Sequence, residues 1–302
     1  MIELPGFVDA HVHLATKGAP LGVTAAELAA RGVVAAVEAG TSGAVDFDEA
    51  AAGWRAALPM RVFANVVPTG LRGERQSWGE PPPDPVAVLR GLKPDGVKVR
   101  LGESPHRDDL QDLLKAQSAA RALGVPLMVH VTGARLPPEK LLDALRPGDV
   151  LTHCYTRSRG KTFAIVDDDG RIFGAAWAAR ERGVAFDVGA SGRHFAPEVA
   201  RAAAAQGFHA TFISSDASSW TFLKTIVPDI PEPLHVSAVA QILVEAGTPF
   251  EEALAAVTTR PAAFFGFALP QRTADDHVAI DERFRLRRVV RGGAVLFEER
   301  SD

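Results

Sequence analysis

Residues 5–14 read Pro-Gly-Phe-Val-Asp-Ala-His-Val-His-Leu, and this stretch indicates both the fold and the chemistry. Apolar residues alternate with Asp9, His11 and His13, which is the period of a β-strand, so both histidines are expected on one side. Two such imidazoles can bind one metal ion, and zinc, nickel and iron all suit this donor. The alternative is a half-buried strand whose histidines only form hydrogen bonds, and a His-x-His pair alone does not decide between the two.

The chain that follows alternates helix-like and strand-like segments. Residues 24–31 predict a helix with Thr24 as its N-cap and Gly32 as its stop. Further helix-like segments separate the strand-like ones as far as residue 265. Eight strands alternating with helices indicate an α/β fold, a (β/α)8 TIM barrel over residues 1–270. After the His-x-His strand, the expected strands are 33–37, 61–67, 96–101, 125–130, 149–153, 184–188 and 210–214.

The last part of the chain, residues 271–302, has a different pattern. Apolar residues alternate between 278 and 286, and a Gly292-Gly293 turn follows. This pattern predicts a small C-terminal β-hairpin outside the barrel.

Polar residues recur at the ends of the predicted barrel strands. His130 ends the fifth strand, His153 ends the sixth, and Asp216 lies just beyond the eighth. Lys98 lies inside the fourth strand, between two valines. Barrel active sites form where the C-terminal strand ends open, so these side chains should meet the two histidines of the first strand there. Each residue alone could be a core histidine, a helix cap or an ion pair, but the combination favours an active site.

This set of motifs resembles the amidohydrolase superfamily, in particular its amidohydrolase/deacetylase metallohydrolase branch. The resemblance covers roughly residues 5–266, and its specificity comes from five separate motifs in the family's order. They are Pro-Gly-Phe-Val-Asp-Ala-His-Val-His at 5–13, Gly-Val-Lys-Val-Arg at 96–100, Val-His at 129–130, Gly-Asp-Val-Leu-Thr-His-Cys at 148–154 and Ile-Ser-Ser-Asp at 213–216.

The resemblance implies a site for two divalent metal ions. His11, His13 and Asp216 would bind the more buried ion, and His130 and His153 the more exposed one. Zinc is the expected metal, although manganese and iron fit the same donors.

Lys98 needs a separate explanation, because an ammonium group has no lone pair. The resemblance implies that CO2 converts it to a carbamate that bridges both ions. This reaction requires a neutral amine, which desolvation between valines favours. Asp216 would act as general acid and base while an activated water attacks a carbonyl group. The expected reaction is hydrolysis of an amide or ester.

The resemblance suggests a small acylated carboxylate as substrate, either an N-acyl amino acid or an O-acyl hydroxy acid. Arg100, Arg157 and Arg193 are candidate partners for its carboxylate. For each arginine, an ordinary solvated side chain is an equal alternative. Tyr155 could donate to a developing oxyanion. His194, beyond the seventh strand, could face either the mouth of the barrel or solvent.

The sequence departs from the family pattern in two places. Few residues precede the first motif, so we expect the N-terminal part of the family's small β-sandwich to be missing and the C-terminal hairpin to have an unpaired edge. That edge would pack on the barrel, pair with a second subunit in a homo-oligomer, or reflect a start codon placed too late. Second, Ala190 and Ala217-Ser218 stand where the branch often has histidines, which leaves the substrate open.

Two other functions remain open, a cyclic-amide hydrolase resembling dihydroorotase and a non-catalytic metal-binding scaffold. The net charge of -4, without a Lys/Arg cluster, argues against a nucleic-acid partner. No apolar stretch is long enough to span a membrane. Cys154 is the only cysteine, and no signal peptide is evident, so we expect a cytoplasmic protein acting on a small molecule.

Overall fold

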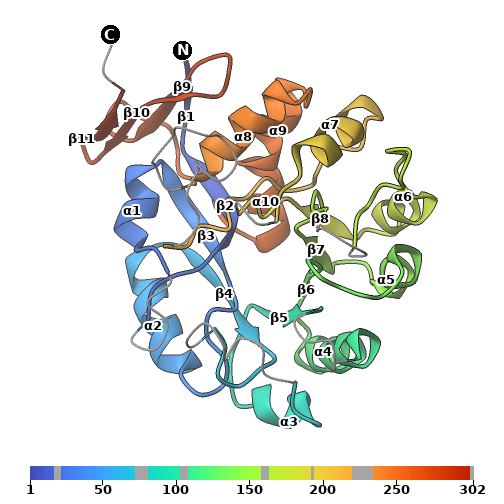
Figure 1. Ribbon diagram of the computed structural model, residues 1–302. Helices are drawn as coiled ribbons and strands as arrows, with labels where there is room; N and C mark the ends of the chain where they lie inside the picture. The colour runs from blue at the N-terminus through green and yellow to red at the C-terminus, as the bar shows by residue number, and fades with distance from the viewer. Residues whose placement is uncertain are drawn as a thin grey trace.

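The computed structural model describes residues 1–16, 22–71, 81–102, 108–157, 163–191, 194–219 and 234–299. Within these residues, seven parallel strands follow one another in chain order, and helices surround them (Figure 1). The predicted α/β barrel is confirmed. Its strands are β2 (Phe7–Val12), β3 (Val33–Ala39), β4 (Met60–Asn65), β5 (Gly96–Arg100), β6 (Leu127–His130), β7 (Val150–Thr152) and β8 (Ala185–Asp187).

Residues 210–217 occupy the eighth position of the barrel without forming a regular strand. On one side, the amide of Val188 donates to the carbonyl of Phe212 at 3.1 Å. On the other side, the amide of Asp216 donates to the carbonyl of His11 at 2.9 Å. Isolated parallel bridges join this segment to both neighbouring strands. The eighth strand predicted at 210–214 is therefore a bridging segment that brings the last part of the barrel back to the first strand.

The local sequence accounts for the ends of two helices. Thr24 and Glu27 form a capping box before α1 (Ala25–Ala30), and Gly32 follows it with φ +85°. The side chain of Asp108 caps α4 (Asp109–Leu123), which ends at Gly124 with φ +68°. The other helices are α2 (Phe47–Ala57), α3 (Pro85–Leu89), α5 (Pro138–Ala144), α6 (Gly174–Glu181), α7 (Pro197–Ala205), α8 (Val236–Glu245), α9 (Phe250–Ala256) and α10 (Thr259–Phe265). None of the described helices combines the length and the apolar character needed to cross a lipid bilayer.

The first barrel strand does not alternate as strictly as its sequence suggests. The register of β2 against β3 shifts between Asp9 and Val12. Ala10 packs in the apolar cluster inside the barrel, whereas Val12 packs in the larger cluster between strands and helices. A β-bulge accounts for this change of face, because it inserts one extra residue opposite the neighbouring strand. The bulge therefore interrupts the strict alternation of this stretch, although His11 and His13 still point to one place.

The interior of the barrel is filled by apolar side chains, so it is a packed core rather than a pore. Phe265 of α10 contributes to this cluster, and Met128 of β6 contacts Lys98 through a distance of 3.3 Å between Sδ and Nζ. The lysine therefore stands directly on the apolar core. The cluster consists of Ala10, Val37, Ala39, Phe63, Met128, Val150, Ala185, Phe212 and Phe265.

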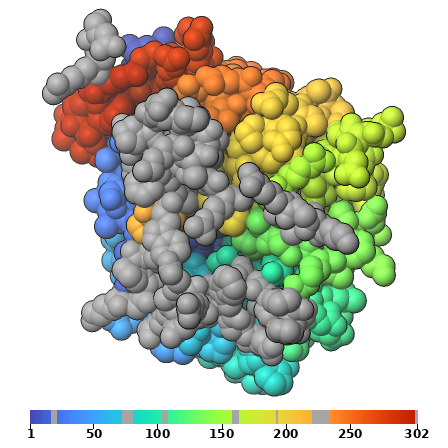
Figure 2. Space-filling model, viewed as in Figure 1, coloured from blue at the N-terminus to red at the C-terminus, as the bar shows by residue number. Residues whose placement is uncertain are grey.

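A second, antiparallel sheet joins one strand that precedes the barrel to three strands that follow it. Its order is β1 (Ile2–Leu4), β9 (His277–Ile280), β10 (Leu286–Arg291) and β11 (Ala294–Glu298). Ile2 lies opposite Ile280, so β1 covers the edge of β9 that the sequence was expected to leave unpaired. The ring of Phe284 lies 6.4 Å from that of Phe7 and 5.1 Å from that of Phe250, which joins the sheet to the barrel. In Figure 2 this sheet (red) forms a lobe at the edge of the molecule.

Candidate metal centre

The strand register places polar residues of four neighbouring strands at one level. Arg100 on β5 lies opposite His130 on β6. His130 lies opposite Thr152 on β7, and Thr152 opposite Asp187 on β8. Each is the last residue of its strand. Because paired residues in a parallel sheet point to the same face, these side chains gather at the C-terminal mouth of the barrel.

One nitrogen of His11 is held by the protein, and the other is directed toward the centre of this mouth. Its Nδ1 lies 2.8 Å from the hydroxyl of Thr152 and 3.2 Å from Oδ2 of Asp187. Its Nε2 lies 3.4 Å from Nζ of Lys98 and 3.3 Å from Oδ1 of Asp216. A proton on Nδ1 directed to the carboxylate leaves the lone pair of Nε2 available, as in metal-binding histidines.

His13 repeats this arrangement with different partners. Its Nδ1 lies 2.9 Å from the hydroxyl of Thr41, which in turn donates to the carboxylate of Glu38. Its Nε2 lies 3.3 Å from Oδ1 of Asp216. The Nε2 atoms of His11 and His13 therefore face the same carboxylate oxygen. This is the convergence that the His-x-His spacing predicts for two ligands of one ion.

His153 is held by a backbone group rather than a carboxylate. Its Nδ1 donates to the carbonyl of Gly189 at 2.8 Å, and its backbone has φ +65°. A Cβ atom at Gly189 would lie 2.7 Å from this Nδ1 and 2.7 Å from Oγ1 of Thr152. Gly189 itself has φ +48°. The backbone after β8 thus approaches the ring as closely as only a glycine allows.

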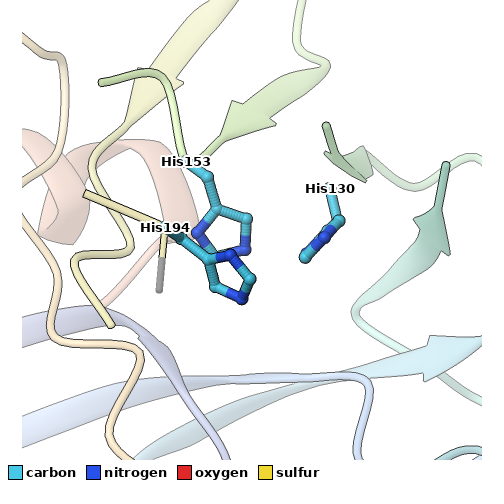
Figure 3. A group of neighbouring side chains, drawn as sticks. All are labelled: His130, His153 and His194. Carbon is cyan, nitrogen blue, oxygen red and sulfur yellow. The ribbon is translucent and has the colours of Figure 1, made fainter. Parts of the chain in front are cut away.

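Three further imidazoles meet at the mouth, as Figure 3 shows for His130, His153 and His194. The ring centroids are 4.5 Å apart for His130 and His153, 4.9 Å for His130 and His194, and 4.3 Å for His153 and His194. Each ring offers a nitrogen within 4.8 Å of the others. A second group with the same property is formed by His11, His153 and Asp216. His153 belongs to both groups, so the two lie next to each other.

Lys98 is buried beside these histidines, with 2% of its surface exposed. Burial lowers its pKa from 10.5 to about 7, because a desolvated ammonium loses its hydration. A substantial fraction of its amine is therefore neutral near pH 7. Gly40 makes room for its stem, because a Cβ atom there would lie 2.6 Å from the Cβ of Lys98.

The protonation states of the other side chains also suit a metal ion. Burial lowers the pKa values of His11, His130 and His153 well below the usual range, so these three imidazoles are neutral. Burial also acts to lower the pKa of His13, but the hydrogen bonds and charges of Asp216 and Glu38 outweigh it and raise that pKa, so a metal ion would displace a proton there. Burial alone would raise the pKa of Asp216, but the hydrogen bond and charge of His13 outweigh it and lower that pKa. Neutral imidazoles and a carboxylate are the donors that divalent transition metals bind. The donor set present therefore fits a metal centre.

The sequence did not reveal the residues that hold the histidine rings. Asp187 has the clearest signal in hindsight, because it is a charged residue in a buried strand; it accepts hydrogen bonds from Thr152 and Ser214. Burial raises its pKa to about 6. Glu38 has the same signal, because it is the charged residue of the buried strand β3. Thr41 has no comparable signal, since its role depends on how the loop after β3 turns back to Glu38.

The three candidate arginines for substrate binding differ in their surroundings. Arg100 ends β5 opposite His130, and its positive charge contributes to lowering the pKa of that histidine. Arg157 is exposed and donates to the carbonyl of Asp167 at 3.0 Å. Arg193 lies outside the described residues.

Tyr155 is not brought to the mouth as an oxyanion donor. Its hydroxyl donates to the carbonyl of Phe208 at 2.9 Å, and 1% of its surface is exposed. Phe208 in turn packs between Trp177, Phe186 and the guanidinium of Arg180. The tyrosine ring therefore fills the layer between strands and helices, and its hydroxyl proton is donated to Phe208 rather than to the mouth.

Comparison with curated proteins gives three similar sequences, all named deacetylase. The protein of Brucella anthropi is 27% identical over 284 residues, and that of Agrobacterium fabrum is 28% identical over 293. The protein of Enterococcus faecalis is 29% identical over 234 residues. These matches cover 89%, 89% and 70% of this chain, which spans 67%, 66% and 59% of the respective relatives. No family model matches the chain.

Solved structures share the fold. A dihydroorotase superposes with a TM-score of 0.76 at 23% identity, covering 98% of this chain and 84% of that one. An adenine deaminase gives 0.77 at 22% identity, covering 98% and 87%. The deacetylase relatives and the shared fold agree with the resemblance to the amidohydrolase superfamily that the sequence motifs carry. As in other barrels, the candidate site lies at the C-terminal strand ends.

Proposed function

We propose that this protein is a metal-dependent amidohydrolase of the deacetylase type, with two metal sites at the mouth of the barrel. The inner site consists of His11, His13 and Asp216, and the outer site includes His130 and His153. The Nε2 atoms of His11 and His13 both lie 3.3 Å from the same oxygen of Asp216, beside the amine of Lys98. This observation carries the proposal. The deacetylase names of the curated relatives support it.

We further propose that Lys98 becomes a carbamate that both sites share. Its Nζ lies next to the inner site, and burial keeps its pKa near 7, so the neutral amine that reacts with CO2 is accessible at physiological pH. As a carbamate the side chain would carry a negative charge and two oxygen donors. It would thereby balance the charge that bound cations bring into this buried place.

Bound divalent ions would polarise a carbonyl oxygen and lower the pKa of a water molecule. The remaining steps belong to the side chains of this chain. Asp216 is ionised, lies at the mouth and has Oδ1 within 3.3 Å of two imidazoles, so it can accept a proton from water and return it to the leaving amine or alcohol. The apolar core under Lys98 excludes water from the opposite side.

For the substrate, we propose a small acylated carboxylate, with the acyl group at the metal sites. Arg100 supports this class, because it places a positive charge at the level of His130, at the edge of the candidate site. An N-acyl amino acid or an O-acyl hydroxy acid would fit. A cyclic amide is the second candidate, since the fold is shared with a dihydroorotase.

The experiment is a metal analysis followed by a substrate screen. Protein purified without chelator and supplied with bicarbonate should contain about two zinc-like ions per chain. It should then hydrolyse members of a panel of N-acyl amino acids and O-acyl hydroxy acids faster than dihydroorotate or hydantoins. Labelling with carbon-13 bicarbonate should give a carbamate signal that Lys98→Met removes. A chain that takes up no metal and hydrolyses nothing would contradict the proposal and favour a metal-free scaffold.

A further inference from the structure

We infer that His194 is a third protein ligand of the outer metal site, so that this site is made of three histidines. The inference rests on the proposed metal function and adds to it a ligand from the loop after β8. No motif in the sequence assigns this role to His194.

The position of the ring carries the inference. His194 lies with its centroid 4.3 Å from that of His153 and 4.9 Å from that of His130, and one nitrogen of each ring lies within 4.8 Å of the others (Figure 3). Two nitrogens bound to one tetrahedral zinc ion at about 2.1 Å are separated by about 3.4 Å. Small side-chain rotations are therefore enough to bring the three nitrogens to one ion.

Backbone hydrogen bonds hold the described residues on both sides of His194. The amide of His194 donates to the carbonyl of Ser191 at 3.0 Å, and the amide of Ser191 donates to the carbonyl of Gly189 at 2.8 Å. Two residues further on, the amide of Ala196 donates to the carbonyl of Tyr155 at 2.9 Å. Gly189 is also the residue whose carbonyl accepts from His153. One short segment thus orients His153 and presents His194.

A third nitrogen changes how the outer site depends on the rest of the centre. With His130 and His153 alone, the ion needs the carbamate of Lys98 to complete its protein ligands. With His194, three imidazoles are present, which is the number that holds a catalytic zinc ion in other proteins. The outer site should therefore retain its ion when CO2 is removed, and its occupancy should depend on the loop after β8.

The test is a cobalt titration of the full chain, in which the visible absorption of Co²⁺ reports the ligands and a competing chelator gives two dissociation constants. We expect His194→Ala and His194→Gln to weaken the outer site at least tenfold, with an altered absorption spectrum, and to leave the inner site within about twofold of wild type. Added imidazole should restore the outer site of His194→Ala. His277→Ala, which removes a histidine from β9, should match wild type.

The outcomes separate this inference from the proposed function. If wild type binds two ions and both His194 variants bind them with unchanged constants and spectra, the inference is wrong and the metal function stands. A rise of KM alone would give His194 a substrate contact and would also overturn the inference. Equal weakening by His277→Ala would show a non-specific effect and overturn it too. A wild-type protein that binds no cobalt would contradict both.

Discussion

The two proposed metal sites hold their histidines in different ways. In the inner site, the rings of His11 and His13 come from the end of β2 and the residue just after it. The Nδ1 of each is held by a hydroxyl and a buried carboxylate, Thr152 with Asp187 or Thr41 with Glu38. In the outer site, the rings come from separate segments, and His153 is held by a backbone carbonyl.

This difference should determine metal affinity. A carboxylate behind an imidazole makes the ring a stronger donor and fixes its orientation. A backbone carbonyl fixes the orientation without contributing a full negative charge. We therefore expect the inner site to fill first and to change little with loop conformation, and the outer site to bind its ion more weakly and to respond to changes in the loops after β7 and β8.

The largest effect is expected from Asp216, for which we propose two roles, as a ligand of the inner site and as the group that transfers the proton. Asp216→Asn keeps the shape of the side chain but removes the charge and the proton acceptor. The value of kcat/KM should fall by about 10⁴-fold or more, while the circular dichroism spectrum stays that of the folded protein. Asp143→Asn, on the exposed side of α5, is the matched control and should keep full activity. Retained turnover in Asp216→Asn would remove Asp216 from the mechanism.

The pH dependence of stability should reveal the amine between the two sites. Burial lowers the pKa of Lys98 from 10.5 to about 7, so the folded metal-free protein holds this proton less tightly than the unfolded chain does. Stability should therefore rise with pH above 7 by roughly 1.4 kcal/mol per unit from this group, and the cost should be complete below pH 7. Lys98→Met removes this pH-dependent contribution to the unfolding free energy.

Urea unfolding of both proteins in CO2-free buffer at pH 6 and pH 9 measures the effect. The advantage of Lys98→Met over wild type should shrink by about 2–3 kcal/mol between these values. A difference that does not change with pH would mean that the amine is not desolvated. The site would then lack the neutral amine near pH 7 on which carboxylation depends.

A smaller effect is expected when the carboxylate behind His11 is removed. Asp187→Asn should weaken the inner site about 10–100-fold and leave the outer site nearly unchanged. Stability should not fall much, because burial already raises the pKa of Asp187 to about 6 and so disfavours its charged form. Chelator competition gives both constants. Equal weakening of the two sites would show that they are not held independently.

The smallest effect concerns the backbone support of the outer site. Gly189→Ala places a Cβ atom 2.7 Å from the ring of His153, at a position with φ +48°. It should lower the unfolding free energy by about 1–2 kcal/mol and weaken the outer site. Gly53→Ala in α2, where a Cβ atom meets nothing within 4 Å, should instead stabilise the protein by about 0.5–1 kcal/mol. Thermal unfolding of the two variants compares them directly.

The sequence predicts the barrel well because its signals are local. Hydrophobic runs, the Thr24 cap and the Gly292-Gly293 turn all depend on neighbours in the chain, and the structure confirms the alternation of strands and helices. The bulge near Ala10 and the bridging form of residues 210–217 depend on how distant segments pair. Those features could not be obtained from periodicity.

The residues of the candidate site also differ in whether local sequence signals predict their positions. His11, His130 and Lys98 are predictable because they belong to strands whose ends open at one mouth. Tyr155 follows such a strand too, but its side chain points into the helix layer, where its hydroxyl donates to the carbonyl of Phe208. His194 gathers with the other imidazoles through a backbone contact after β8, in which its amide donates to the carbonyl of Ser191. Loop paths of this kind have no sequence period.

The pairing of β1 with β9 has a consequence for the order of folding. Ile2 and Ile280 are partners although 277 residues separate them in the chain, and Asp9 accepts a hydrogen bond from Ser215. Contacts of such high sequence separation form late, because loop closure must precede them. During synthesis on the ribosome, His11 and His13 would leave the exit tunnel about 200 residues before Asp216, so their pocket forms only after that segment has followed. Metal binding should accordingly come after the synthesis of the eighth barrel segment.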